Sequence, residues 1–108
     1  MKIVPGDIFT IRNLKHQGDS KQRPATIVSP TSRNDYFDTV VVVPLTTNPT
    51  EAQFRPLVSG SGLKYSSRAE CERLTTIRKQ YLGDHIGTVD AESLSRIKEG
   101  IVHALELY

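Results

Sequence analysis

The chain has 108 residues, of which 37% are hydrophobic and 24% charged, and its formal net charge of +2 excludes the composition of a disordered chain. At this length we expect one domain, residues 1–108, with one hydrophobic core, so a functional site must share the surface of the fold. Cys71 is the only cysteine, which excludes an intrachain disulfide and a multi-cysteine metal site.

The N-terminal segment bears on the cellular compartment. Pro5 and Gly6 stop the opening residues before an apolar stretch of signal-peptide length develops, and no later segment approaches ~18 apolar residues. We therefore expect a cytoplasmic protein with no membrane contact. Residues 1–34 carry six Lys and Arg against two Asp, a basic excess that suits a phosphate-bearing ligand and equally an ordinary solvated surface.

Two short β-rich runs, residues 8–11 and 25–29, are predicted to be strands. The polar segment between them, residues 13–22, contains His16, Gln17 and a glycine. Such a composition is typical of an exposed loop that is available to a ligand.

An uninterrupted β-branched run at residues 39–43 predicts a central strand that is covered on both faces. We expect Pro44 to end the hydrogen-bonded ladder of this strand, because proline has no N–H to donate. Residues 45–50 are then predicted to form a loop that presents small hydroxyl side chains.

The segments that follow give weaker signals. Residues 54–58 and 71–77 are further predicted strands. Residues 60–62 (GSG) and 81–84 (YLGD) are predicted turns.

The C-terminal segment has helical periodicity. Asp90 is a favourable N-cap, and the apolar residues that follow at spacings of three and four fall on one helical face: Leu94, Ile97, Ile101, Ala104 and Leu105. Five or six short strands followed by one helix predict a mainly β fold, a strongly bent antiparallel sheet or partial barrel closed by a C-terminal helix.

The side chains offer little support for metal or thiol chemistry. His16, His85 and His103 are far apart in the chain, and Glu70 and Glu72 lack a third or fourth ligand, so we expect no metal and no cofactor. Cys71 lies between these two carboxylates, which should raise its pKa, and a small buried apolar residue is the favoured interpretation over a nucleophile.

Arg23 and Thr46 form the remaining set with chemical potential, together with the polar loop that holds His16. RNA carries its own nucleophile, the ribose 2′-hydroxyl, so a ribonuclease needs only to orient the backbone and to stabilise charge on the phosphorane oxygens. An arginine fork suits that task because it can bond two phosphate oxygens and stays cationic. On the residues alone, a surface ion pair for Arg23 and a turn cap for Thr46 are the favoured interpretation.

An ordered set of short motifs runs through the chain. They are residues 6–8 (GDI), 22–29 (QRPATIVS), 42–47 (VVPLTT), 62–64 (GLK), 76–77 (TI), 82–83 (LG) and 86–87 (IG), followed by the C-terminal helix. In this order they resemble the landmarks of MazF/PemK-family toxins, and the resemblance covers essentially the whole chain.

This resemblance implies a five- to seven-stranded SH3-like barrel with a C-terminal helix, acting as a homodimer. It further implies metal-independent cleavage of single-stranded mRNA at short motifs, leaving a 2′,3′-cyclic phosphate, and neutralisation by an antitoxin whose disordered acidic tail covers the RNA groove. The family's catalytic arginine matches Arg23 and its catalytic threonine Thr46. Thr47 and Phe54 match RNA contacts, and the loop around His16 and Gln17 matches a substrate-gating loop.

Residues 70–73 depart from the family pattern. Many members have C-D-Q where this chain has Cys-Glu-Arg at 71–73, and in parts of the family an Arg-x-Asp pair at the positions of Glu70 and Glu72 assists proton transfer. Glu72 can replace the aspartate as an acid or base, whereas Glu70 cannot replace a cation and would repel the RNA backbone. We predict Glu72 as a catalytic residue and place Glu70 and Arg73 among the RNA-facing ones.

This departure leaves open whether specificity has shifted or catalysis is weakened. The main alternative is a family member that keeps the barrel and binds its antitoxin, another protein or nucleic acid without cleavage. A third possibility is a gyrase poison of the same barrel class, which depends on an aromatic and hydrophobic C-terminal tail. Residues 105–108 (LELY) have some of that character, but the Arg-Pro and Pro-x-Thr motifs favour the ribonuclease.

Overall fold

The structure, a computed structural model, describes residues 2–12 and 23–107. Within these ranges the chain forms seven strands, two α-helices and two short 3-10 helices. In chain order they are β1 (Asp7–Ile11), β2 (Arg23–Ile27), α1 (Thr31–Tyr36), β3 (Thr39–Thr46), β4 (Leu57–Val58), β5 (Ser67–Ala69), η1 (Cys71–Arg73), β6 (Thr75–Arg78), η2 (Lys79–Tyr81), β7 (Leu82–Thr88) and α2 (Ala91–Leu105).

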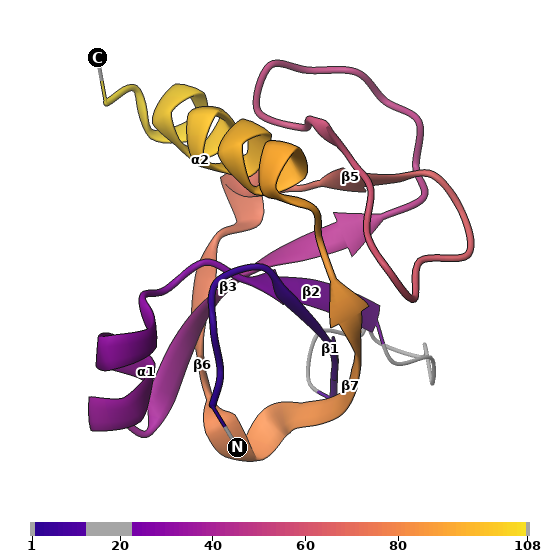
Figure 1. Cartoon of the computed structure of the whole chain (residues 1–108). Helices are drawn as coiled ribbons and strands as arrows, with labels where there is room; N and C mark the ends of the chain where they lie inside the picture. Colours follow the sequence, from indigo (N-terminus) through magenta and orange to yellow (C-terminus); the bar gives the residue numbers. More distant parts are fainter. Residues whose placement is uncertain (1, 13–22, 108) are drawn as a thin grey trace.

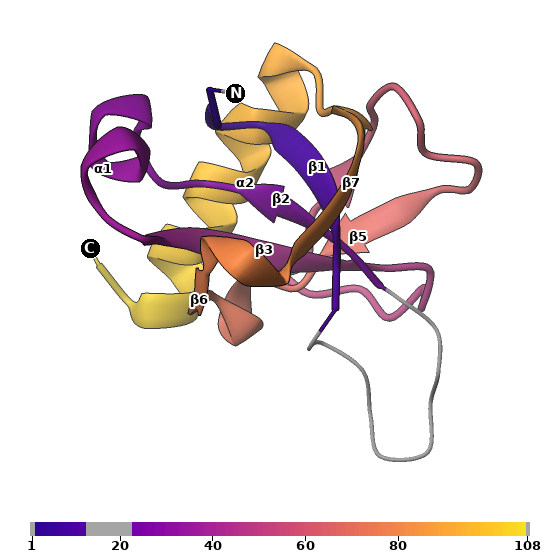
Figure 2. The same ribbon diagram turned by 90° about the horizontal axis from the view of Figure 1, so that it is seen from below.

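All seven strands join one antiparallel sheet. Its order is β4-β5-β3-β2-β1-β7, and β6 pairs with β3 beside this path. The strands curl into a half-barrel, and α2 lies across one side of it (Figure 1). Seen from below, the helix lies against one face of the curled sheet (Figure 2). The predicted mainly β fold with a C-terminal helix is confirmed.

Strand β3 is central, as its β-branched run predicts. It pairs with β2 along one edge and with β6 and β5 along the other, and Val40, Val42 and Val43 are fully buried. The prediction that Pro44 ends the strand is wrong, because β3 continues to Thr46.

The position of Pro44 explains why the strand tolerates it. β6 pairs with β3 up to Val42, and β5 takes over from Leu45, so the proline lies where one partner strand replaces another. Its carbonyl still accepts a hydrogen bond from the backbone N–H of Glu70, at 2.8 Å. Only the donor that proline lacks is missing from the ladder.

The strands divide the hydrophobic core in two, because successive side chains of a strand point to opposite faces. The cluster under α2 contains Ile8, Val43, Leu45, Val58, Ala69, Cys71, Val89 and Ile97. The cluster on the other face of the sheet contains Ile3, Phe9, Ile11, Ala25, Ile27, Val40 and Val42.

Several weaker predictions need correction. The predicted strand at 71–77 is the 3-10 helix η1 followed by β6, and only Leu57–Val58 of the predicted strand at 54–58 is extended in a ladder. The turn expected at 81–84 falls earlier, at η2. Neither α1 nor β5 is predicted from the sequence, because they are six and three residues long and too short for a periodic pattern.

Helix α2 begins where its cap predicts. Asp90 Oδ1 accepts a hydrogen bond from the backbone N–H of Ser93 at 2.7 Å, and Ile97 is fully buried in the cluster under the helix. Leu105, predicted on the apolar face, is half exposed at the end of the helix. None of the helices in the described ranges is long and apolar enough to cross a membrane.

The N-cap formed by Asp90 makes the free energy of unfolding depend on pH. Hydrogen bonding from Ser93 lowers the pKa of Asp90 below its ordinary value. A carboxyl with a lowered folded-state pKa stabilises the fold above its unfolded pKa of about 3.9, and this contribution is lost as the pH falls through the folded-state pKa. We therefore expect Asp90→Ala to lower the Tm by a few degrees at pH 7, with the difference from the wild type shrinking below about pH 4. Thermal melts monitored by circular dichroism at pH 7 and pH 3 check this, and an undiminished difference at pH 3 would contradict it.

Candidate active site

Arg23 and Thr46 end two neighbouring strands at the same edge of the sheet. β2 begins at Arg23 and β3 ends at Thr46. The antiparallel ladder between them pairs Ile27 with Val42 and ends at Ala25 and Pro44, and the same register extended by two residues would set Arg23 opposite Thr46. Residues directly opposite in an antiparallel pair have their Cβ atoms about 4.5–5.5 Å apart.

Both side chains also lie on the same face of the sheet. Along β3, Val40 and Val42 belong to the core cluster away from α2, and the period of two places Thr46 on their face. Along β2, Ala25 and Ile27 belong to that cluster and place the first residue of the strand on it likewise. Arg23 and Thr46 therefore share the face of the sheet that carries this apolar cluster.

The Thr46 hydroxyl has a defined role in the local turn. Its Oγ1 accepts a hydrogen bond from the backbone N–H of Asn48 at 3.1 Å, and Asn48 in turn accepts from Thr50. The turn-cap interpretation of Thr46 is thus realised. Because the oxygen acts as an acceptor in this turn, its own proton is available for donation to a ligand oxygen.

A second arginine, Arg68, lies next to Thr46 on the neighbouring strand β5. The ladder between β3 and β5 pairs the two residues directly, and Arg68 also pairs with Leu57 of β4. Its side chain is only 14% exposed and donates from Nη1 to the carbonyl oxygen of Arg55 at 2.8 Å. Two arginines therefore flank Thr46 in the sheet, although only Arg23 was selected from the sequence.

Glu70 and Glu72 share one cation, Arg55. Its Nε and Nη2 donate to Oε2 of Glu72 at 2.8 Å and 2.5 Å, and Nη2 lies 3.5 Å from Oε2 of Glu70. A second guanidinium, that of Arg73, lies 3.7 Å from the same Glu70 oxygen. The hydrogen bond to Glu72 raises the pKa of Arg55 above its ordinary value. Neither carboxylate faces a ligand as an uncompensated charge.

Cys71 is fully buried between these carboxylates, with Sγ 3.5 Å from the carbonyl oxygen of Ile97. Burial, and secondarily the charge of Glu72, raises the pKa of the thiol to about 12. Such a group packs as a small apolar residue and is no nucleophile at neutral pH.

This burial predicts thiol behaviour. With a pKa of about 12, the thiolate fraction at pH 8 is on the order of one in ten thousand. We expect Ellman's reagent to modify Cys71 at pH 8 at least about 100-fold more slowly in the native protein than in concentrated urea. Similar rates in the two states would contradict the buried placement.

The other predicted site residues are scattered more widely. Thr47 is exposed directly after β3, and Arg73 is exposed on η1. Phe54 is half-buried and packs against the core cluster under α2. His16 and Gln17 lie outside the described residues.

Sequence reasoning missed Arg55 and Arg68. Neither belongs to a motif or to a strand that the sequence defines well. The available signal was indirect, since two glutamates on either side of a buried cysteine need a cation nearby, and Arg55 is a candidate for it.

His85 holds two strands of the fold together. His85 Nε2 lies 3.1 Å from Asp7 Oδ1, and the ring packs edge-on against Phe9. The other oxygen of Asp7 accepts the backbone N–H of Val4 at 3.0 Å. This pair ties β1 to β7. Within the described ranges no group of three or more His, Cys, Asp or Glu side chains is placed to hold a metal ion.

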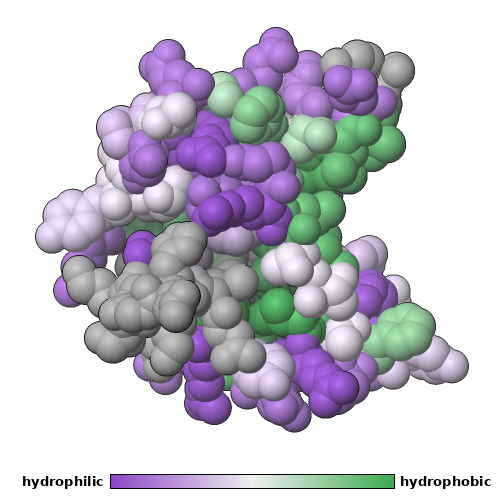
Figure 3. Space-filling view, turned by 180° about the vertical axis from the view of Figure 1, so that it is seen from behind, coloured by the Kyte–Doolittle hydropathy of each residue, from purple (hydrophilic) through white to green (hydrophobic). Residues whose placement is uncertain are grey.

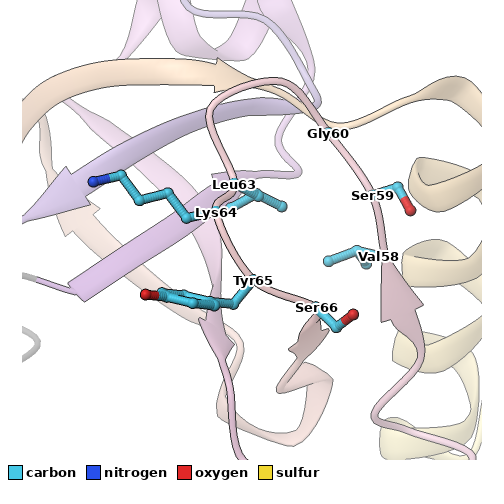
Figure 4. A pocket seen from close by; sticks show the side chains of 7 residues that line it. All are labelled: Val58, Ser59, Gly60, Leu63, Lys64, Tyr65 and Ser66. Carbon is cyan, nitrogen blue, oxygen red and sulfur yellow. The ribbon is translucent and has the colours of Figure 1, made fainter.

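A shallow pocket of about 240 Å³ lies in the connection between β4 and β5. Figure 4 shows its lining residues, with Lys64 and Tyr65 extending side by side away from α2. None of the predicted site residues within the described ranges lines it. The connection leads into β5, which carries Arg68 opposite Thr46.

The comparisons with known proteins agree on one fold. An endoribonuclease from a mycobacterial species, solved in complex with its cognate antitoxin, superimposes with a TM-score of 0.84 at 24% identity, covering 97% of this chain and 96% of that one. Mycobacterium tuberculosis toxin MazF-mt6 gives 0.76 at 25% identity, covering 94% and 96%. MazF from Deinococcus radiodurans gives 0.75 at 13% identity, covering 95% and 94%.

The sequence comparisons identify the family. No curated protein matches the chain. The family described as PemK-like, MazF-like toxin of type II toxin-antitoxin system matches residues 4–105, nearly the full length. The chain therefore belongs to the PemK-like and MazF-like family of toxins of type II toxin–antitoxin systems.

Proposed function

We propose that the chain is an endoribonuclease toxin of the cytoplasm that cleaves single-stranded mRNA at specific sequences without a metal. The ribose 2′-hydroxyl attacks the adjacent phosphorus, the 5′-oxygen of the next nucleotide leaves, and a 2′,3′-cyclic phosphate remains. The observation that carries this proposal is that β2 begins at Arg23 and the neighbouring β3 ends at Thr46 at the same edge of the sheet, with a register and a side-chain period that put both residues on one face.

Arg23 stabilises the phosphorane in this proposal. Charge accumulates on the nonbridging oxygens as the 2′-hydroxyl adds, and a planar guanidinium can donate to two of them at once. Arginine stays protonated at neutral pH, so Arg23 acts as an electrostatic stabiliser and leaves proton transfer to other groups. The Thr46 hydroxyl, held by its bond from Asn48, donates to the same phosphate and positions it.

Glu72 is the proposed acid or base. Both of its hydrogen bonds from Arg55 go to Oε2, and no group of the described residues bonds Oε1. Oε1 is therefore the oxygen that can accept a proton from the attacking hydroxyl or pass one to the leaving oxygen.

Further RNA contacts are proposed around this centre. Thr47 and Arg73 are exposed and can donate to phosphates or base edges, and Phe54 can offer ring surface to a base. His16 and Gln17 complete the set on the β1–β2 connection. Glu70 is proposed to face the RNA with its charge compensated by Arg55 and Arg73.

The proposed partners are a cognate antitoxin and a second copy of the chain. One similar solved structure is described as an endoribonuclease in complex with its cognate antitoxin from a mycobacterial species, and another as MazE-MazF from Deinococcus radiodurans. Hydrophobic surface gathers along one flank, where the outline is indented below the C-terminal end of α2 (Figure 3). Leu105 and Leu107 are exposed at that end of the helix. Light scattering after size exclusion tests the proposed homodimer.

Digestion of a long mixed-sequence RNA in EDTA tests the function. We expect the purified chain to cut at one recurring short motif and to leave ends that resist ligation until the cyclic phosphate is removed. Failure to cut any such RNA would overturn the enzymatic proposal. The rival interpretation, a module that binds without cleaving, predicts retained antitoxin binding and no Arg23-dependent growth arrest in bacteria.

A further inference from the structure

The arginine between the two glutamates is not part of any motif in this chain. Arg55 lies in the connection between β3 and β4, 15 residues before Glu70 and 17 before Glu72. Its side chain is 20% exposed and reaches both carboxylates, while that of Glu70 is 12% exposed. A half-buried guanidinium that bridges two carboxylates beside a proposed phosphate site needs an explanation beyond surface solvation.

The backbone around Arg55 is fixed on both sides. The carbonyl of Phe54 accepts from the backbone N–H of Cys71 at 3.1 Å, and that of Pro56 accepts from Ala69 at 3.0 Å. The carbonyl of Arg55 itself accepts from Nη1 of Arg68 at 2.8 Å. Three consecutive carbonyls are thus bonded to β5 and its extension, so the guanidinium starts from a rigid base and loses little conformational entropy in holding Glu72.

This path links Arg55 to the proposed phosphate site. Arg68 pairs with Thr46 in the ladder, and its guanidinium holds the carbonyl of Arg55, whose side chain holds Glu72. Because both donors bond the same oxygen of Glu72, the carboxylate is fixed in orientation while Oε1 stays accessible. The arrangement is that of a preoriented acid or base.

The charge balance of the cluster supports the same role. Without Arg55, the proposed site would hold the two carboxylates of Glu70 and Glu72 with only Arg73 near them, and negative charge weakens the binding of an anionic phosphodiester. With Arg55 and Arg73 present, each carboxylate has a cation within 4 Å. A carboxylate can therefore act next to RNA without repelling it.

We propose that Arg55 is a positioning residue of the active site, which holds the Glu72 carboxylate in one orientation for proton transfer and compensates the charge of Glu70. This inference rests on the proposed ribonuclease function. It assigns the positioning of Glu72 to a cation outside residues 70–73, which also shares with Arg73 the compensation of Glu70. It predicts that the departure of residues 70–73 from the family pattern leaves cleavage intact.

Kinetics of Arg55 variants test the proposal. We expect Arg55→Gln to lower kcat about 10- to 100-fold and to change KM less than about threefold, because misplacing an acid or base affects the chemical step. Arg55→Lys should recover part of the loss, since the lysine keeps the charge without the fork. The double variant with Glu72→Gln should be no slower than Glu72→Gln alone, because the two residues act as one unit.

The controls separate this inference from its premise. Arg78→Gln removes an exposed arginine opposite Thr39, at the far end of β3, and should leave kcat unchanged. Circular dichroism melts show whether each variant folds. If the wild-type chain cuts RNA and Arg55→Gln cuts equally fast, or if its loss adds fully to that of Glu72→Gln, this inference is overturned. If the wild-type chain does not cut, the proposed function fails and the inference fails with it.

Discussion

Replacing Arg23 by alanine is expected to lower kcat/KM for RNA cleavage by about 10²–10³-fold, the cost of removing one preorganised donor from a developing oxyanion. The fold should be unaffected, because Arg23 is the exposed first residue of β2. Lysine should recover only part of the rate, since a point charge cannot bond two phosphate oxygens in one plane. Cleavage of a fluorogenic RNA that contains the cutting motif, measured in EDTA, gives these ratios.

The same assay tests whether Arg23 acts together with Thr46. Thr46→Val removes the hydroxyl at nearly constant shape, and Thr46→Ser keeps it. If both side chains hold one phosphate, the Arg23→Ala and Thr46→Val losses should combine to less than their product, as they do for residues that act as a unit. Multiplying losses would show that the two residues work on separate groups, and full activity of Arg23→Ala would remove the basis of the proposed mechanism.

The second large effect is on stability, at Gly87. A Cβ atom there would lie 1.8 Å from the carbonyl oxygen of Ser61, so the β4–β5 connection would have to leave β7. The two segments are held by the bridge between Gly60 and Val89 and by the hydrogen bond from the Ser61 N–H to the carbonyl of Thr88. We expect Gly87→Ala to lower the free energy of unfolding by on the order of 3 kcal/mol.

Urea unfolding measures this cost, with Ser61→Ala as the matched control. That variant removes only the hydroxyl that accepts from the N–H of Thr88 at 3.0 Å, and it should lose about 1 kcal/mol. If Gly87→Ala lost no more than this control, the close contact between the two segments would be wrong.

The parts of the fold that the sequence predicts well are those with a local signal. The β-branched run of β3 and the capped, periodic α2 carry such signals within their own residues. The predicted end of β3 at Pro44 was wrong. The strand tolerates this proline because β5 replaces β6 as its neighbour there, and that arrangement is set by the tertiary structure. The short α1 is likewise stabilised from outside, since the buried Asn34 donates to the carbonyl of Ile3.

The residues of the candidate site likewise fall into those that local sequence predicts and those that only the tertiary structure reveals. Arg23 and Thr46 could be selected from the sequence because each sits in a short motif next to a strand, and the register then brings them together. Arg55 could not, because its contact with Glu72 joins positions 17 residues apart across an irregular connection. Glu70 likewise has one cation near it in the sequence, Arg73, and a second, Arg55, that only the folded chain brings within 3.5 Å.

A crystal structure with a target RNA that carries a 2′-deoxyribose at the cutting position tests the central claim most directly. Such an RNA keeps the scissile phosphate and lacks the nucleophile. We predict that the Arg23 guanidinium and Thr46 Oγ1 both lie within about 3.2 Å of oxygens of that one phosphate. A bound RNA whose scissile phosphate touches neither residue, or whose phosphate contacts Arg23 and Thr46 at different nucleotides, would contradict the account.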